Sequence, residues 1–262
     1  MLIEMNDVSL IQNQKRIIQH LNWKVEDGQH WAILGLNGAG KTTLLNLVCG
    51  YLFPTKGTMK VLGKEFGKYP LQDLRKEIGW VSNSLLEKMK YHDESTGLQI
   101  VLSGKFASIG LYDTPTDADV EKASKIMDQV GVQKLRNQPC RNMSQGEKQR
   151  ILIGRAFMAS PKILILDEPC AGLDFLSKEQ LLKTIEQMAA HNRTTLIYVT
   201  HHIDEILPVF SHTLLLKEGN VFSEGMTENQ LTSDKMSQFS ATAVHISKEN
   251  NRYALKLPDD NV

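Results

Sequence analysis

The stretch WAILGLNGAGKT, residues 31–42, decides the fold of this chain. It opens with four apolar residues, a pattern typical of a short strand that is buried on both faces. The residues that follow, Gly35–Thr42, match G-x-x-x-x-G-K-[S/T], the pattern of a phosphate-binding loop. A helix is expected from Lys41 to about Gly50. The loop would therefore join the end of a strand to the start of a helix, as phosphate binding requires.

The residue types in this loop fit the chemistry of a nucleoside triphosphate. Its glycines let backbone N–H groups approach phosphate oxygens, and the start of the helix adds partial positive charge. Lys41 is expected to reach the β- and γ-phosphates, and Thr42 is expected to ligate Mg²⁺. The alternative is a glycine-rich turn without a ligand, but the flanking strand and helix argue against it. The predicted nucleotide contacts are Gly35, Leu36, Asn37, Gly38, Ala39, Gly40, Lys41, Thr42 and Thr43.

Composition is that of an ordinary soluble globular protein. The 262 residues are 41% hydrophobic and 23% charged, which suits one large domain or a core with a subdomain. Thirty basic residues balance thirty acidic ones, which disfavours nucleic acid as a partner. The scattered cysteines indicate free thiols in a reducing cytoplasm. No apolar run approaches the length of a membrane span, and the N-terminus is unlike a signal peptide.

The order of apolar patterns predicts a wound α/β core that is interrupted by helices. Strand patterns occur at 2–10, 16–25, 31–35, 58–63, 78–82, 162–167, 194–200 and 212–217. Helical patterns dominate from about 85 to 159, and another helix is expected over 177–190. We therefore predict a main domain over 1–225 with a helical part inserted at about 85–159. A short extension over 226–262 is expected to end in a hairpin.

Two apolar strands are followed by polar residues at their carboxyl ends, where ligands bind in open α/β sheets. ILILDEP places Asp167 and Glu168 after one strand. We expect Asp167 to hold Mg²⁺ and Glu168 to polarise the attacking water, although such a pair alone is often only a solvated loop start. IYVTHH places His201 after another strand, and we interpret it as a γ-phosphate contact and His202 as a bystander. A zinc site is disfavoured, because the other histidines are scattered.

The segment MSQGE, residues 143–147, has two compatible interpretations. Ser144 and Glu147 form the pattern of a capping box at the start of a helix. Gly146, however, is a poor residue for a first helical turn, which indicates that the backbone there needs space. A similar stretch, VLSGK at 101–105, ends a predicted helix, and Gly104 is interpreted there as a left-handed residue beyond the helix end.

These motifs, together with AGLD at 171–174, resemble in order and spacing those of ATP-binding cassette (ABC) proteins. The resemblance covers about residues 2–225, and the residue pattern is most similar to that of ATPases of metal-chelate and vitamin importers. It implies an α/β fold: a P-loop NTPase (RecA-like) core with an antiparallel β subdomain and an inserted α-helical subdomain. It also implies that one subunit's Ser144, Gln145, Gly146 and Glu147 bind the γ-phosphate held by the other, and that Asp174 contacts that partner.

The sequence departs from the family pattern at two positions. Asn83 stands where the family has a glutamine that contacts the nucleotide and Mg²⁺, and its shorter side chain predicts a loop shift or a bridging water. Gln12 stands where an aromatic residue commonly stacks on adenine, which predicts looser discrimination between ATP and GTP. Trp23 and Trp31 are expected to pack in the β subdomain instead.

The resemblance implies an ATPase that uses ATP and Mg²⁺, with Lys41, Glu168 and His201 in catalysis. It implies a head-to-tail homodimer that energises a separate membrane permease from the cytoplasmic face of the cell membrane. The alternative is a soluble ABC ATPase that remodels a ribosomal or nucleic-acid complex. The single cassette and the balanced charge disfavour that alternative. A P-loop kinase is a remote third possibility, because MSQGE and AGLD have no place in it.

Overall fold

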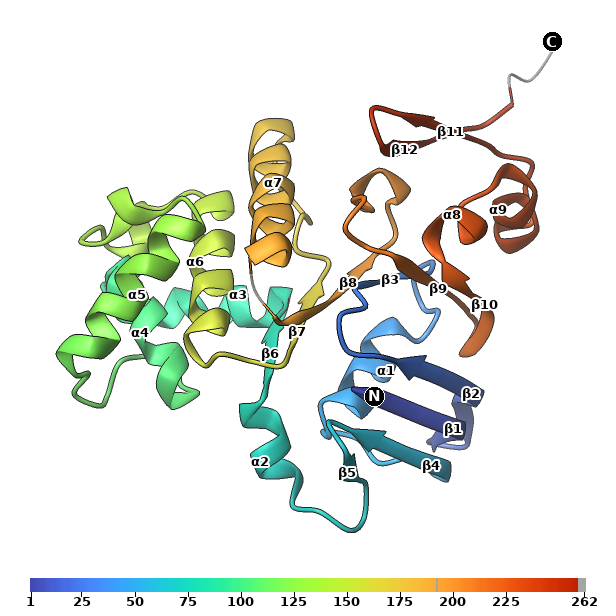
Figure 1. The fold of residues 1–262 in the computed structure, drawn as a ribbon, viewed down its shortest axis with the longest axis horizontal. Coiled ribbons are helices and arrows are strands. Elements are labelled where there is room, and N and C mark those ends of the chain that lie inside the picture. Colours follow the sequence, from blue (N-terminus) through green and yellow to red (C-terminus); the bar gives the residue numbers. More distant parts are fainter. Residues whose placement is uncertain (192, 259–262) are drawn as a thin grey trace. The chain divides into compact units, whose positions relative to one another are not determined.

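The computed structural model describes residues 1–191 and 193–258. The chain forms two compact units, which we call the first unit (Met1–Arg75 with Thr195–Val262) and the second unit (Lys76–Thr194). Figure 1 shows the elements of both, coloured along the sequence. Among the described residues, no helix is both long and apolar enough to cross a bilayer.

The first unit contains two sheets. In the antiparallel sheet the strand order is β2-β1-β4-β5. In the other sheet, β3 lies between β8 and β9 and runs parallel to both, and β10 pairs antiparallel with β9. The bounds of these strands are β1 (Ile3–Gln12), β2 (Lys15–Val25), β3 (Trp31–Leu34), β4 (Lys56–Val61), β5 (Lys64–Glu65), β8 (Thr195–Thr200), β9 (His212–Lys217) and β10 (Asn220–Met226).

Helices and a hairpin complete the first unit. The bounds are α1 (Lys41–Val48), α2 (Leu71–Lys76, which crosses the boundary), the 3₁₀ turn η5 (Ile203–Glu205), α8 (Thr227–Gln230), α9 (Ser233–Ser240), β11 (His245–Glu249) and β12 (Arg252–Lys256). The hairpin expected at the end of the chain is present, because β11 and β12 pair antiparallel. Its turn residues, Asn250 and Asn251, both have positive φ, as a two-residue hairpin turn requires.

The second unit pairs β6 with β7 in parallel and surrounds α6 with helices. In Figure 1, α4, α5 and α6 lie together in green to yellow. The bounds are β6 (Ile78–Val81), α3 (Asn83–Met89), η1 (Lys90–His92), α4 (Gly97–Ser103), η2 (Gly104–Phe106), α5 (Asp117–Gln129), η3 (Gln133–Leu135), η4 (Cys140–Asn142), α6 (Gln145–Met158), β7 (Ile163–Asp167) and α7 (Phe175–His191). The helical region and the return to strands therefore occur where the periodicity predicts them.

The interpretation of Gly104 as a left-handed helix end is wrong. Its φ is −61°, and the chain continues from it into η2. A Cβ at this position would collide with the backbone carbonyl oxygen of Arg155 on α6. The glycine is needed because two helices approach each other closely, and the left-handed residue is Ala107, at φ 55°.

Trp23 and Trp31 are buried, as expected, but only Trp23 belongs to the antiparallel sheet. Trp23 on β2 is fully buried, and its ring meets that of Trp31 edge to face at 5.6 Å. Trp31 lies on β3 of the other sheet and also stacks on His212, with ring centroids 4.9 Å apart. Trp31 therefore packs between the two sheets, where neither tryptophan lies open to a base.

The buried cysteines carry no structural cross-link. Cys49, Cys140 and Cys170 are all buried, and none of them forms a disulfide. Burial raises the pKa of the Cys140 thiol to about 11, so this thiol stays protonated at neutral pH. The cysteines therefore contribute to packing, as small apolar side chains do.

Candidate nucleotide-binding site

The loop between β3 and α1 presents an uncapped helix start. Gly40 is the N-cap of α1, its φ is 100°, and no side chain caps the helix. The first turn also contains no acidic residue. Amide N–H groups at such a helix end, with the partial positive charge of the helix, form a binding site for an anion.

Lys41 adds a full positive charge inside this loop. Its side chain is buried, and Nζ donates to the carbonyl oxygens of Gly35 at 2.8 Å and Leu36 at 3.4 Å. The ammonium group therefore lies within the curve of the loop, over the turn that the glycines form. The contact of Lys41 with the β- and γ-phosphates stays a prediction.

The loop is supported by the turn between β9 and β10. Gly219 donates its N–H to the Ala39 carbonyl at 2.9 Å and accepts the N–H of Gln19 at 2.9 Å. A Cβ at Gly35 would lie 2.7 Å from the Leu216 carbonyl oxygen, so β9 also excludes a side chain there. These contacts were not predicted from the sequence, because they join segments that are far apart along the chain.

His201 lies beside the start of the loop. In the parallel register of β3 and β8, Leu34 pairs with Thr200. The next residues on the two strands, Gly35 and His201, therefore leave the sheet on neighbouring strands, which are about 4.8 Å apart in such sheets. His201 and His202 are both exposed, with ring centroids 4.1 Å apart. No cluster of three metal-ligating His, Cys, Asp or Glu side chains occurs among the described residues.

The second unit brings three further predicted residues to one sheet edge. Val81 of β6 pairs with Leu166 of β7, so Asn83 and the pair Asp167 and Glu168 follow the same end of two neighbouring strands. Asn83 is exposed as the first residue of α3, and both acids are half-buried. Glu168 has φ 49°, a left-handed conformation that costs a side-chain-bearing residue energy and occurs frequently at functional sites.

The start of α6 has the predicted capping box. The Ser144 hydroxyl accepts the Glu147 N–H at 3.2 Å, and the Glu147 carboxylate accepts the Ser144 N–H at 3.0 Å. Burial acts to raise the pKa of Glu147, but the hydrogen bonds from Ser144 and the ammonium of Lys134 outweigh it, so the pKa is lowered. The carboxylate is therefore ionised at neutral pH and adds negative charge at this helix start.

The residues near this helix start also bind to one another within the chain. Gln145 donates from Nε2 to the Ala171 carbonyl at 3.2 Å. Asp174 accepts the N–H of Ser177 at 2.9 Å and its hydroxyl proton at 2.7 Å, and these two bonds lower the pKa of Asp174. A Cβ at Gly146 would lie 2.9 Å from the Ser177 Cβ. The segments 144–147 and 171–177 therefore form one contiguous surface of the second unit.

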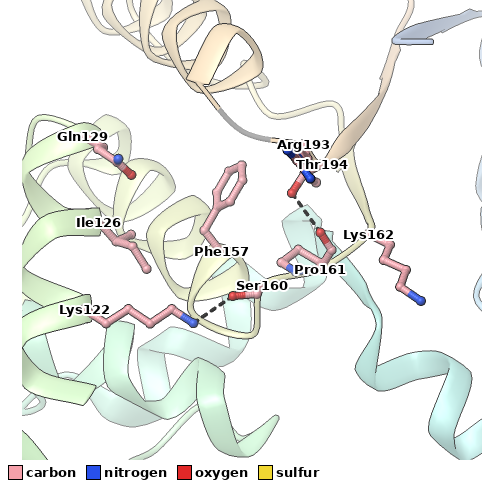
Figure 2. A pocket seen from close by; sticks show the side chains of 9 residues that line it. All are labelled: Lys122, Ile126, Gln129, Phe157, Ser160, Pro161, Lys162, Arg193 and Thr194. Carbon is pink, nitrogen blue, oxygen red and sulfur yellow. Dashed lines mark hydrogen bonds between the residues drawn. The ribbon is translucent and has the colours of Figure 1, made fainter. Parts of the chain in front are cut away.

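The described cavity of the second unit lies away from these residues. It has a volume of about 350 Å³ and is lined by residues of α5, of the end of α6 and of the segment before β7 (Figure 2). Lys122 points into this region and donates to the Met158 carbonyl and the Ser160 hydroxyl, both at 2.8 Å. It thereby satisfies the carboxyl end of α6. The cavity is at the start of β7, whereas Asp167 is at its end.

The predicted site residues therefore fall into three groups, one in the first unit and two in the second unit. The first unit groups Gly35–Thr43 with His201, and the second unit groups Asn83, Asp167 and Glu168 at one edge and 144–147 with Asp174 on one surface. Gln12 is exposed at the end of β1, beside the hairpin turn. A role for each of these residues stays a prediction.

Comparison with known proteins decides the family. Residues 18–171 match the family model described as ABC transporter. The chain belongs to the ABC transporter family. An uncharacterised ABC transporter ATP-binding protein of Bacillus subtilis, YlmA, is 48% identical over 94% of this chain and 93% of its own length.

Solved structures agree with the ABC fold. The cbiO1 protein of Clostridium perfringens, part of the ABC transporter complex cbiONQ, superposes with a TM-score of 0.79 at 24% identity, over 90% of this chain and 93% of that one. An inward-facing ABC transporter described as metal-chelate type gives a TM-score of 0.76 at 25% identity, over 97% of this chain and 95% of that one. The expected fold class, a P-loop NTPase core with an antiparallel β sheet and helices, is confirmed, and the chain is an ABC-type ATPase.

Each unit of the ABC ATPase has, among its predicted site residues, side chains with oxygen donors of the kind that magnesium prefers. Thr42 and Asp167 carry oxygen ligands, which Mg²⁺ prefers, and Asn83 adds an amide oxygen at the same edge as Asp167. Mg²⁺ in nucleotide sites usually completes its six ligands with phosphate oxygens and water.

Proposed function

We propose that this chain is the Mg²⁺-dependent ATP-hydrolysing subunit that energises a separate membrane permease, through ATP-driven dimerisation. The observation that carries the proposal is the start of α1, which combines an uncapped helix end with a buried lysine. This combination recognises a triphosphate by its charge and geometry. Membership of the ABC family supports ATP as the nucleotide.

Each predicted residue has a role in this proposal. Lys41 and the amides of Gly35–Thr43 bind the β- and γ-phosphates, and Thr42, Asn83 and Asp167 bind Mg²⁺, which neutralises charge that develops on the phosphates. Glu168, whose left-handed backbone is a conformation frequent at functional sites, orients and polarises the attacking water. His201 contacts the γ-phosphate from the neighbouring strand.

We further propose a head-to-tail homodimer in which residues 144–147 of one subunit close over the γ-phosphate held by the other. Two consecutive large apolar residues support a protein contact beside Asp174: Phe175 and Leu176 are 74% and 67% exposed at the start of α7. Exposed apolar side chains of this size are typical of surfaces that become covered. The capping box lets Ser144 satisfy the helix start while no partner is bound.

The permease contact is proposed for the helical part of the second unit. Tyr91 and Tyr112 are 87% and 78% exposed there, and the Tyr112 ring meets that of His92 at 6.4 Å. Tyrosines are enriched in protein interfaces because they combine apolar area with a polar group. The similarity to a part of the cbiONQ complex supports a multi-subunit transporter, and the proposal places the chain at the cytoplasmic face of the membrane.

The proposed dimer is tested with Glu168→Gln in the full chain. Removing the carboxylate should lower ATP hydrolysis about a hundredfold or more, because it removes the group that polarises water. The dimer should then accumulate in the presence of ATP, and light scattering after size exclusion would detect it. Glu186→Gln, an exposed position on α7, is the matched control and should hydrolyse ATP normally. If ATP does not raise the dimer fraction of Glu168→Gln, the closed dimer is wrong.

The permease is tested by copurification. A tagged chain should be recovered from detergent-solubilised membranes together with an integral-membrane protein. Recovery only with ribosomal or DNA-bound fractions would overturn the transport proposal and favour the soluble ABC ATPase.

A further inference from the structure

The turn that carries His201 is fastened from inside the first unit by a buried carboxylate. Glu205 is 4% exposed, and its Oε2 accepts hydroxyl protons from Thr200 at 2.6 Å and Tyr198 at 3.0 Å. The Thr200 hydroxyl also accepts the N–H of His202 at 3.0 Å. The last residues of β8 and the turn that follows are thus joined by one hydrogen-bond network that passes on either side of His201.

The same turn is bound on its outer side by the end of the chain. Arg252, the first residue of β12, donates from Nε at 3.1 Å and from a terminal nitrogen at 2.8 Å to the carbonyl oxygen of Asp204. β12 and η5 are neighbours, and Figure 1 shows the red hairpin beside the turn that follows β8. Two donors from one planar guanidinium fix the carbonyl more firmly than a single bond would.

The hairpin is itself well anchored, so it can act as a support. The Ser233 hydroxyl accepts the N–H of Ile246, and the Ser237 hydroxyl accepts the N–H of Val244, each at 2.9 Å. Tyr253, next to Arg252, is 7% exposed. Through these contacts α9 and the hairpin form one body that ends at the turn.

We propose that Arg252 is a positioning residue for His201, and that the C-terminal hairpin acts in ATP hydrolysis by fixing the turn His201–Glu205. The proposal rests on the role proposed above for His201. The contact to Asp204 is three residues beyond His201, in a turn that has only one 3₁₀ segment. A shift of that carbonyl would therefore move the imidazole, and small misplacements of reacting groups reduce rates strongly.

The test compares Arg252→Ala with Lys256→Ala in the full chain. Lys256 is an exposed residue of the same strand and controls for the loss of a positive charge. Arg252→Ala should lower kcat for ATP hydrolysis by about three- to tenfold, less than the hundredfold of a full 1 Å displacement. KM for ATP should change less than kcat, because Gly35–Thr43, which is proposed to make most of the phosphate contacts, is untouched. Hydrogen exchange should become faster at the amides of residues 201–207 and not at residues 35–43.

A second variant keeps the proposal testable if Arg252→Ala destabilises the whole first unit. Arg252→Lys keeps the charge and most of the packing but cannot donate two bonds in a plane, so it should give a smaller fall in kcat with the same local change in exchange. If Arg252→Ala speeds exchange throughout the first unit, Arg252→Lys decides. Normal kcat and normal exchange in residues 201–207 of Arg252→Lys would overturn the proposal.

His201→Ala separates this inference from the proposed function. If His201→Ala hydrolyses ATP at the normal rate, the role of His201 is wrong, whatever Arg252 does. If His201→Ala is inactive while both Arg252 variants behave normally, the proposed function stands and only the inference falls.

Discussion

Two helix starts of this ABC ATPase are proposed to meet the same phosphates, yet they are built in opposite ways. α1 begins at a glycine in a left-handed conformation, with no side-chain cap and no acidic residue in its first turn. α6 begins with Ser144 and Glu147 in a reciprocal capping box. α4 and α5 begin with the same kind of box.

The difference suits α1 to the primary binding of phosphate and α6 to a contact that forms only when a partner subunit is present. At α1 no side chain caps the helix start, and Lys41 supplies a positive charge there. At α6 the chain satisfies its own helix start, and the Glu147 carboxylate adds negative charge beside it. We therefore expect α1 to dominate nucleotide binding and α6 to act only when a bound nucleotide and a partner subunit are both present.

The largest expected effect is at α1. Lys41→Ala should lower ATP hydrolysis by about a hundredfold or more, because a preorganised positive charge at the transferring phosphate is lost. Lys56→Ala, at an exposed position on β4, is the control and should keep its activity. Steady-state phosphate release measures both. Equal activities would mean that the start of α1 does not bind the triphosphate.

An intermediate effect, on the free energy of unfolding, is expected at α6, where Gly146 faces Ser177. Gly146→Ala would place a Cβ 2.9 Å from the Ser177 Cβ, which cannot rotate away. The start of α7 must shift, and such overpacking costs about 1–3 kcal/mol of the free energy of unfolding. Denaturant unfolding of the chain without nucleotide measures it.

A double-mutant cycle gives this prediction its control. Ser177→Gly removes the Cβ that the new methyl group meets, so Gly146→Ala should cost less in that background. An equal cost in both backgrounds would show that Gly146 is not limited by Ser177. The space would then be needed only for the partner's nucleotide, which is the meaning that the family resemblance gives to it.

The sequence predicts the fold well because its signals are local. Strand and helix periods, with a motif at the junction of β3 and α1, predict the strands β1 to β4 and β6 to β9, the helical region between β6 and β7, and the final hairpin, but not the short elements β5, α2, β10, α8 and α9. The capping box of α6 is equally local, since Ser144 and Glu147 are a single helical turn apart. The pairing and register of β3 and β8, which bring His201 beside Gly35, come from the structure and not from these local signals.

What the sequence does not predict depends on contacts between distant segments. Gly104 looks like a helix end, and only the approach of Arg155 on α6 shows why it is a glycine. The bond from Arg252 to Asp204 joins residues 48 positions apart and has no sequence signal. The sequence also gives no sign that Glu205 is buried and that its carboxylate accepts bonds from Tyr198 and Thr200.

The smallest expected effect concerns pH and distinguishes α6 from α1 again. The folded pKa of Glu147 is lowered, so the unfolded state binds more protons as the pH falls below about 4.5. The stabilisation from Glu147 is therefore complete above that pH and is lost as the pH falls through the folded pKa.

Ser144→Ala removes the hydroxyl that binds the Glu147 N–H and should cost about 1 kcal/mol near pH 7. It also removes one of the interactions that lower the pKa, so the difference in free energy of unfolding from the unchanged chain should shrink in acid. Urea unfolding at several pH values measures this difference, and Glu186→Gln should leave the acid dependence unchanged. A difference that stays constant with pH would show that Ser144 and Glu147 are not coupled. α1, with no acid in its first turn, has no such pH-dependent component to lose.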